Sequence, residues 1–260
     1  MAAVVLTIAG SDPSGGAGIQ ADLKTFQAFG VHGTTVVTSV TVQNTVGVRD
    51  RHDVPPAIVA AQLDAVLDDL PIAAAKTGLL PDARLVDVVV ERLSARPIAA
   101  LVVDPVLVAT SGDALAAPSA LTAIRDRLVP IATLVTPNLS EAEALTGRPV
   151  QSVAAMRDAA VALRARGARA VLVKGGHLPE RACDVLATAE DVYELDAPRL
   201  ELGPVHGTGC TLSAAITAEL AVGRTLVDAV RSARDYVRRA LAASRSLGHG
   251  SRLLDHGRGG

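Results

Sequence analysis

The chain has 260 residues, of which 49% are hydrophobic and 20% are charged, a composition typical of one globular domain with a buried core. The net charge is −2, no run of Lys or Arg could follow a phosphate backbone, and aromatic residues make up only 2%, so nucleic acid is excluded as an expected partner. Because no apolar stretch reaches about 18 residues and the N-terminus lacks the pattern of a secretory signal, we expect a cytoplasmic protein without a membrane partner.

Apolar, β-branched runs alternate along the chain with helix-length amphipathic segments, which predicts an α/β fold built on a parallel sheet. Strands are expected at residues 2–9, 34–42, 72–77, 98–104, 132–137 and 168–174. Helices are expected at residues 18–29, 57–70, 82–95, 119–128, 140–146, 152–166, 208–221 and 226–246. Since no linker or repeat interrupts this order, we expect one domain over residues 1–260, with the last ten residues loosely held.

The first strand leads into a glycine-rich loop, GSDPSGGAGIQAD at residues 10–22. A Walker phosphate loop would need Lys and then Ser or Thr after its last glycine, and neither is present. A dinucleotide-binding loop would need a glycine at position 21, where the sequence has Ala21. Neither familiar phosphate loop fits, and a flexible turn flanked by Asp12 and Asp22 stays an alternative.

Polar residues and glycines follow every predicted strand, as GSDPSGG, QNT, TGL, PV, NLSE and GGH in chain order. The carboxyl ends of parallel strands lie at the same edge of a sheet, where open α/β sheets bind their ligands. The sequence therefore predicts a ligand site along this edge.

Two lysines stand at the ends of predicted strands, Lys76 in AKTG and Lys174 in VKGGH. Only three of the 25 basic residues are lysines, so each position is noteworthy. A compact ammonium on a flexible stem suits a phosphate, although a solvated lysine at a strand end is an equally ordinary interpretation of either residue.

Asn138 and Glu141, in TPNLSE, are spaced to lie on the same side of an opening helix turn. An amide and a carboxylate so placed can hold the water shell of a Mg²⁺ ion. The ordinary alternative is a helix cap with a glutamate in the first turn.

The stretch VHGTGCTLSAAI predicts a loop that turns into a buried helix near Thr208. Gly207 and Gly209 let backbone N–H groups converge at the positive end of that helix, which predicts an anion hole formed by Gly207, Thr208, Gly209 and Cys210. Among those amides we expect a thiolate at Cys210 to be stabilised and its pKa lowered. The alternative is a small buried cysteine, and neither Cys210 nor Cys183 belongs to a CxxC or zinc pattern.

Seven motifs together resemble, in order and spacing over residues 4 to about 256, the hydroxymethylpyrimidine/phosphomethylpyrimidine kinase family of thiamine biosynthesis. They are TIAGSDPSGGAGIQADLKTF, TSVTVQNTVGV, AAKTGLL, VVDPVLVATSGD, TPNLSEAEAL, VKGGHL and HGTGCTLSAAI. The resemblance implies a ribokinase-like three-layer fold, with a central, mostly parallel sheet and helices on both faces, and a homodimer. It also implies ATP, Mg²⁺ and two successive phosphorylations of 4-amino-5-hydroxymethyl-2-methylpyrimidine, first of the alcohol and then of the monophosphate.

The resemblance also implies roles for individual residues. Gln43 matches the position that reads the pyrimidine, where other members carry Glu, and an amide both donates to and accepts from such a ring edge. Cys210 matches the catalytic base, and Glu141 with Asn138 matches the pair associated with magnesium, which is held through water. The other matches are Asp22, Ala17, the backbone at Val42, Leu79 and Val106 in the substrate pocket, Lys174, Asn138, Asp104 and Thr136 on the nucleotide side, and Gly207–Cys210 at the anion hole.

One position departs from the family pattern, since Thr110 stands in VATSGD where relatives often carry Lys. This departure argues against a cation in that loop being needed for phosphate binding. Two other functions stay open at this stage: a pyridoxal or pyridoxine kinase, whose substrate is a similar hydroxymethyl heteroaromatic ring, and a pyrimidine-binding regulator that has lost catalysis. Gln43 and the QNT motif favour the pyrimidine over pyridoxal.

Overall fold

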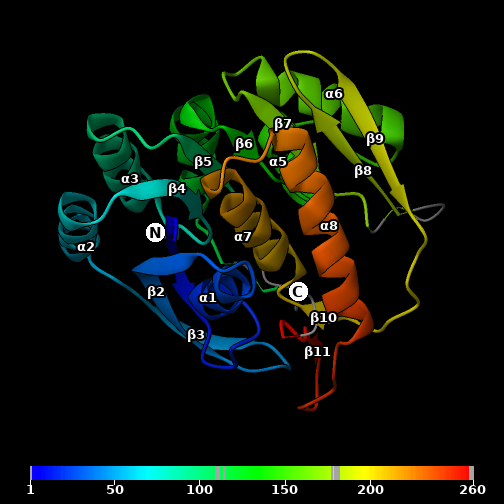
Figure 1. Ribbon diagram of the computed structural model, residues 1–260, viewed down its shortest axis with the longest axis horizontal. Helices are drawn as coiled ribbons and strands as arrows, with labels where there is room; N and C mark the ends of the chain where they lie inside the picture. Colours follow the sequence, from blue (N-terminus) through cyan, green and yellow to red (C-terminus); the bar gives the residue numbers. More distant parts are fainter. Residues whose placement is uncertain (1, 109–111, 114, 177, 179–181, 258–260) are drawn as a thin grey trace.

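The computed structural model describes residues 2–108, 112–113, 115–176, 178 and 182–257. In this part of the chain, nine strands form one sheet in the order β3-β2-β1-β4-β5-β6-β7-β8-β9 (Figure 1). The six neighbouring strands from β2 to β7 run parallel, and the other strands join antiparallel at the two edges. The parallel strands are β1 (Val4–Ser11), β2 (His32–Gln43), β4 (Ile72–Thr77), β5 (Ala100–Val103), β6 (Leu134–Val135) and β7 (Ala170–Val173).

Helices cover both faces of this sheet. One face carries α1 (Gly18–Ala28), α7 (Thr208–Ala221) and α8 (Leu226–Ala242), with α7 packed between the other two. The other face carries α2 (Pro56–Asp69), α3 (Ala83–Ala95), α4 (Pro118–Ala123), α5 (Leu139–Thr146) and α6 (Val153–Arg164). Among the described residues, no helix combines the length and apolar character that a membrane span needs. The three-layer fold expected from the motifs is confirmed.

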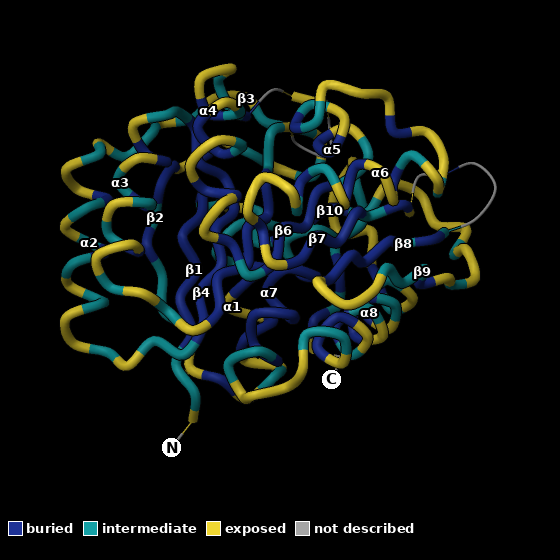
Figure 2. Tube along the Cα trace, turned by 90° about the horizontal axis from the view of Figure 1, so that it is seen from above, coloured by how far each residue is buried: buried dark blue, intermediate teal, exposed yellow. Residues whose placement is uncertain are grey.

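Alternate residues of each central strand feed the two apolar cores. On β1, Leu6 and Ile8 pack toward α2 and α3, whereas Val5 packs toward α1 and α7. Both faces are covered, so the strands have no polar face, and this is why they read as continuous apolar runs in the sequence. Figure 2 shows the central strands and α7 as buried, with exposed residues on the outer turns of helices such as α2 and α3.

All six predicted strands are present, but the strands outside the parallel block were not predicted. These are β3 (Val48–Asp53), β8 (Ala182–Ala187), β9 (Val192–Ala197) and the short parallel pair β10 (Val205–His206) and β11 (Arg252–Leu253). Strand β3 reads VRDRHD, a charged segment that forms a strand because it pairs along the exposed edge of β2. Edge strands commonly carry charge, so an apolar pattern cannot reveal them.

The helix predicted at residues 119–128 is α-helical only as far as Ala123. A π-helical turn follows at Ile124–Leu128, and then a 3₁₀ turn at Val129–Ile131. Pro130 lies inside this second turn and has no backbone N–H to continue an α-helical ladder.

The expectation of a loosely held C-terminus was wrong for its described residues. Strand β11 pairs with β10, Leu254 and His256 are each only 7% exposed, and the Tyr236 hydroxyl donates to the carbonyl oxygen of His256 at 3.1 Å. The segment is rich in Gly, Ser and Arg, and backbone hydrogen bonds rather than an apolar pattern hold it in place.

Candidate active site

The polar loops that follow the strands meet at one edge of the sheet, as predicted. Backbone hydrogen bonds continue from strand to strand beyond the regular ladder: Gly78 N–H donates to Ile8 O at 2.9 Å, and Asp104 N–H to Thr77 O at 3.1 Å. At the far side of the edge, Lys174 N–H donates to Pro137 O at 2.8 Å. These bonds fix the loop residues beside one another at the carboxyl ends of β1, β4, β5, β6 and β7.

The glycine-rich loop after β1 is organised by Asp12. Its carboxylate accepts hydrogen bonds from the N–H groups of Ser14 (2.9 Å), Gly16 (3.2 Å) and Ala17 (2.9 Å), and it lies 3.0 Å from the Nε2 atom of His206. Burial opposes the ionised form, but the bonds from His206 and Ser14 outweigh it and lower the pKa of Asp12. The alternative of a flexible turn is therefore wrong, because a buried carboxylate ties the loop together.

Two glycines join this loop to the start of α7. Gly207 has a φ of +79°, a conformation that favours glycine, and a Cβ atom there would overlap the carbonyl oxygen of Gly16. The contact brings the first turns of α1 and α7 together. Among the described residues, neither helix has a side-chain N-cap or an acidic residue in its first turn. Their N–H groups and partial positive charges are thus available to an anion.

Cys210 lies half-buried in the first turn of α7. Burial raises the pKa of its thiol to about 11, and the carboxylates of Asp22 and Asp104 act in the same direction. The Lys76 ammonium and the Gly18 N–H oppose the rise but do not cancel it. The predicted lowering of this pKa was therefore wrong, because the sequence showed neither the burial of the sulfur nor the two carboxylates close to it.

Lys76 and Asp22 form an ion pair beneath the site, with neither side chain exposed and 2.8 Å between Nζ and Oδ1. The second oxygen of Asp22 accepts a hydrogen bond from Thr7 Oγ1 at 2.6 Å. Asp22 outweighs burial and holds the pKa of Lys76 above its ordinary value. Lys76 is thus not a solvated lysine, and Asp22, predicted in the substrate pocket, has both oxygens engaged within the protein.

Lys174 is the centre of a second cluster of charges. Its Nζ atom lies 2.9 Å from Asp104 Oδ1 and 3.9 Å from Glu141 Oε2. Asp104 also accepts from Thr136 Oγ1 at 3.1 Å and from Ser213 Oγ at 3.3 Å. The structure therefore brings together the residues predicted on the nucleotide side, with Ser213 of α7 as an addition.

Asn138 and Glu141 form a capping box at the start of α5. Glu141 N–H donates to Asn138 Oδ1 at 2.9 Å, and Asn138 N–H donates to Glu141 Oε2 at 2.7 Å. The ordinary interpretation of their spacing is confirmed. The capping box does not explain the weak acidity of Glu141. Burial, reinforced by Asp104 and opposed by Lys174, raises the pKa of Glu141 to about 7.

This arrangement fits a magnesium ion and a phosphate chain. Two buried carboxylates, Asp104 and Glu141, share a single ammonium, so the cluster has an excess of negative charge that a divalent cation would balance. The donors are carboxylate and amide oxygens, which suit Mg²⁺. A Cβ atom on Gly209 would lie only 3.1 Å from Lys174 Nζ, so the glycine keeps the start of α7 open beside the ammonium.

Gln43 lies half-buried at the end of β2, on the other side of the site. Its Nε2 atom lies 3.0 Å from His206 Nε2, and Thr41 Oγ1 lies 3.1 Å from its Oε1. The same His206 nitrogen lies 3.0 Å from Asp12 Oδ2, so the His206 ring lies between Gln43 and the glycine-rich loop. His206 immediately precedes GTGC and had been given no role; its place in that motif was the available signal.

The other residues predicted in the substrate pocket differ in how far they are buried. Leu79 is 7% exposed, and a Cβ atom on Gly10 would lie 3.2 Å from its side chain, whereas Ala17 and Val106 are half-buried. The side chain of Val42 is 55% exposed and points to the opposite face of β2 from Thr41 and Gln43. Only the backbone of Val42 could take the predicted place in the pocket. Thr110 lies outside the described residues.

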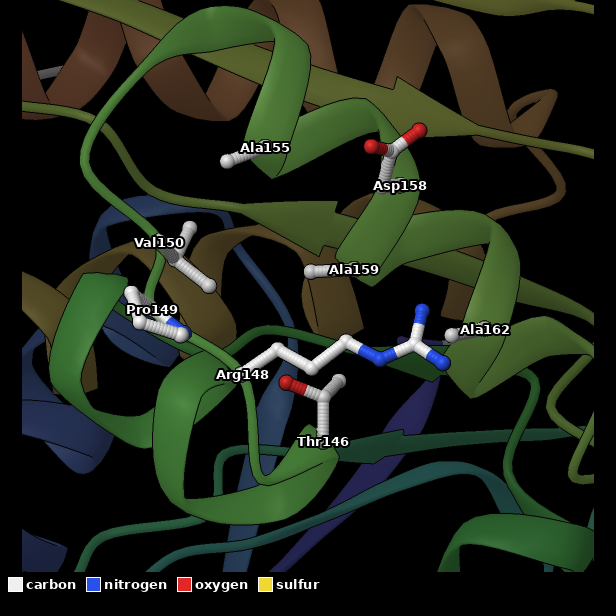
Figure 3. A pocket seen from close by; sticks show the side chains of 8 residues that line it. All are labelled: Thr146, Arg148, Pro149, Val150, Ala155, Asp158, Ala159 and Ala162. Carbon is white, nitrogen blue, oxygen red and sulfur yellow. The ribbon is translucent and has the colours of Figure 1, made fainter.

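In the part of the chain that the structure describes, two hollows lie elsewhere on the molecule, and none of the candidate residues lines them. A cavity of about 80 Å³ lies between α5 and α6, beside Arg148 and Asp158 (Figure 3), and is smaller than the pockets that bind cofactors. An open groove of about 830 Å³ runs between α1 and the C-terminal segment. The candidate site is therefore the edge of the sheet.

Comparison with known proteins agrees with this geometry. The sequence model of a family described as phosphomethylpyrimidine kinase matches residues 12–255. A hydroxymethylpyrimidine/phosphomethylpyrimidine kinase of Streptomyces coelicolor is 49% identical over 98% of this chain and 94% of its own. The ADP complex of Bacillus subtilis pyridoxal kinase has a TM-score of 0.93 and 36% identity over 99% of this chain and 98% of that chain. A phosphomethylpyrimidine kinase of Clostridium difficile has a TM-score of 0.83 and 39% identity over 92% and 99%.

The raised pKa of Cys210 predicts that its thiol is alkylated slowly at neutral pH. With a pKa of about 11, roughly one molecule in a thousand carries the thiolate at pH 8, and the thiolate is the form that alkylating agents attack. Iodoacetamide labelling followed by mass spectrometry should therefore rise about tenfold per pH unit up to roughly pH 10. The Cys210→Ser protein, which retains only the buried Cys183, gives the background. A labelling rate that levels off below pH 9 would contradict this description of the site.

Proposed function

The chain belongs to the phosphomethylpyrimidine kinase family, and we propose that it transfers a phosphoryl group from ATP to 4-amino-5-hydroxymethyl-2-methylpyrimidine and a second to the resulting monophosphate, as in thiamine biosynthesis. The observation that carries this proposal is the closeness of Gly209, in the uncapped first turn of α7, to the Lys174 ammonium. Phosphates can be bound there by backbone N–H groups and by a side-chain cation at once.

On the nucleotide side, Lys174 is the cation that binds phosphate, held in place by Asp104. Asp104 is itself fixed by Thr136 and Ser213, so the ammonium is oriented before any ligand arrives. Glu141, with Asn138 beside it, is the residue that would hold Mg²⁺, through water for Asn138, because its amide oxygen already accepts from the backbone. When bound, MgATP would supply the phosphoryl group, and its metal ion would neutralise part of the phosphate charge.

On the acceptor side, we assign recognition of the pyrimidine to the Gln43 amide. The Gln43 Oε1 atom accepts from Thr41 and the Nε2 atom lies beside His206, and these two contacts limit the directions in which the amide can point. Apolar contact would come from Leu79 and Val106, with Ala17 and the backbone at Val42 closing the pocket. Asp22 contributes indirectly, by holding Lys76 under Cys210.

Catalysis by the chain itself would consist mainly of positioning and charge stabilisation, because phosphoryl transfer has a loose transition state. The N–H groups of Gly207–Cys210 are held in place because the following residues of α7, 211–219, are all buried. Cys210 is the proposed acceptor of the alcohol proton. Its thiolate is a minor species in the free protein at neutral pH, so proton removal is a smaller contribution than charge stabilisation.

Pyridoxal phosphorylation is a second candidate function. The similarity to Bacillus subtilis pyridoxal kinase, with a TM-score of 0.93, favours it. The greater sequence identity to the Streptomyces coelicolor enzyme, 49%, and the amide at Gln43 favour the pyrimidine. A non-catalytic regulator has no such support, because Lys174, Glu141 and the GTGC turn are all present.

A direct assay tests these functions against one another. The protein is incubated with MgATP and either the pyrimidine alcohol or pyridoxal, and the products are followed by mass. We expect the pyrimidine monophosphate and then the diphosphate, with pyridoxal phosphorylated less efficiently. Absence of any pyrimidine phosphate would contradict the proposal.

We also propose that the protein acts in the cytoplasm and as a homodimer. Val40, Val42 and Val46 are 49%, 55% and 62% exposed at the β2–β3 edge, an apolar surface that a second copy could cover. Light scattering that finds only monomers at micromolar concentration would contradict the dimer.

Replacing Gln43 by Ala should weaken pyrimidine binding by about 1–3 kcal/mol, because polar atoms of the ring lose their partner in a pocket with little water. Nucleotide affinity should be unchanged. Ile58→Ala is the control, since this side chain is 53% exposed on α2, outside the pocket and the proposed dimer surface, and it should bind the pyrimidine as the wild type does. Calorimetric titration measures all the affinities. Equal pyrimidine affinity for Gln43→Ala and wild type would refute the assignment.

Replacing Glu141 by Gln should lower turnover and raise the Mg²⁺ concentration required, because a charge next to the metal is lost while the size of the side chain is kept. Lys174→Ala should instead weaken nucleotide binding. Glu143→Gln is the control, an exposed glutamate on the same helix. If the magnesium titration of Glu141→Gln matches that of Glu143→Gln, Glu141 is a helix-capping residue only.

A further inference from the structure

The C-terminal strap, defined here as residues 244–257, runs from the end of α8 to the loops that form the candidate site (Figure 1). Several of its hydrogen bonds and one ion pair lie within the strap itself. Arg245 and Leu253 exchange backbone hydrogen bonds at 2.9 Å, so the strap closes into a loop. The Arg252 guanidinium donates to the hydroxyl and carbonyl oxygens of Ser244, and Arg245 pairs with Asp255 at 3.0 Å. The strap is thus an ordered element.

The strap contacts the turn that follows β2, residues 44–47. Ser251 N–H donates to Thr45 O at 2.8 Å, and Gly250 N–H donates to Thr45 Oγ1 at 3.2 Å. A Cβ atom on Gly248 or Gly250 would overlap atoms of Thr45. The two backbones therefore pack at a distance that only glycine allows, and Thr45 lies two residues from Gln43.

The same strap contacts the anion-binding turn of α7. Strand β11 pairs with β10, in which His206 contacts Gln43, and Arg252 N–H donates to Pro204 O at 2.9 Å. Further along, the His256 ring nitrogen lies 3.1 Å from Thr211 Oγ1 in α7. Leu253 packs against Gly16, where a Cβ atom would lie 2.6 Å from its side chain. All three loops around the proposed pyrimidine pocket thus meet the strap.

Without the strap, the turn after β2 would be weakly held. Its internal bonds run from Asn44 N–H to Gly47 O at 3.2 Å and from Val46 N–H to Asn44 Oδ1 at 2.9 Å, and Val46 is 62% exposed. A turn of this kind samples many conformations, and ordering it on binding lowers affinity. Contact with the strap removes part of that cost before the substrate arrives.

We infer that the C-terminal strap is a positioning element of the acceptor site, which holds the Gln43–Thr45 segment in its binding conformation through Thr45 on one side and His206 on the other. The inference rests on the proposed function, since it concerns binding of the hydroxymethyl heteroaromatic substrate. The bonds from Gly250 and Ser251 to Thr45 lie on the acceptor side, so changes at Gly250 or Thr45 should affect acceptor binding and leave nucleotide binding unchanged.

The test compares Gly250→Ala with Gly203→Ala, a glycine whose added Cβ atom would meet nothing within 4 Å. Gly250→Ala should raise KM and Kd for the pyrimidine alcohol about tenfold, because Thr45 is displaced, while Kd for ADP stays at the wild-type value. Gly203→Ala should match wild type in both. Thr45→Val, which loses the hydroxyl that accepts from Gly250, should shift KM in the same direction, and Thr45→Ser should restore it.

If Gly250→Ala does not fold, the comparison of Thr45→Val with Thr45→Ser still tests the inference. A wild-type protein that fails to bind the pyrimidine contradicts the proposed function itself. Wild-type binding that is unchanged in both Gly250→Ala and Thr45→Val overturns the strap's role alone. Loss of ADP and pyrimidine affinity by the same factor, in step with a lower Tm, also overturns it, because that pattern reports general destabilisation.

Discussion

The site depends on the contact between the backbones of Gly16 and Gly207. Each belongs to a loop that opens a helix, and the contact leaves no room for a side chain on Gly207. It sets the first turn of α7 beside that of α1, with Gly18 N–H near the sulfur of Cys210 and Asp12 binding the N–H groups of Gly16 and Ala17. The anion hole, the glycine-rich loop and the link through His206 to Gln43 all follow from this approach.

Buried charge is balanced in pairs around that contact. Lys76 with Asp22 lies below Cys210, and Lys174 with Asp104 lies beside Gly209. Removing one partner of a buried pair typically costs about 3–5 kcal/mol, so these ions stay fixed in the absence of substrate. Glu141 is the carboxylate without a full counter-charge, and this imbalance gives the nucleotide side a physical reason to bind a cation. The protein thus has a polar environment that needs little reorganisation during phosphoryl transfer.

Much of this was predictable where local pattern decides the structure. Apolar runs located the six parallel strands, and the spacing of Asn138 and Glu141 located a helix start. Seven motifs were sufficient to identify the family, as the comparisons confirm. What failed depended on contacts between distant segments. The pKa of Cys210 is raised by burial and then by Asp22 and Asp104, which are far away in sequence, and the strap is held by backbone bonds to Thr45. Neither is encoded in a local pattern.

The central claim is that the Gly16–Gly207 contact assembles both halves of the site, and paired glycine variants test it most directly. Gly207→Ala and Gly147→Ala impose the same left-handed strain, at φ values of +79° and +72°, but only Gly207 has a neighbour that an added Cβ atom would overlap. Titration calorimetry with ADP and with the pyrimidine alcohol should show both affinities falling at least about tenfold in Gly207→Ala. Gly147→Ala should lose stability and keep both affinities. Wild-type affinity for both ligands in a folded Gly207→Ala protein would contradict the account.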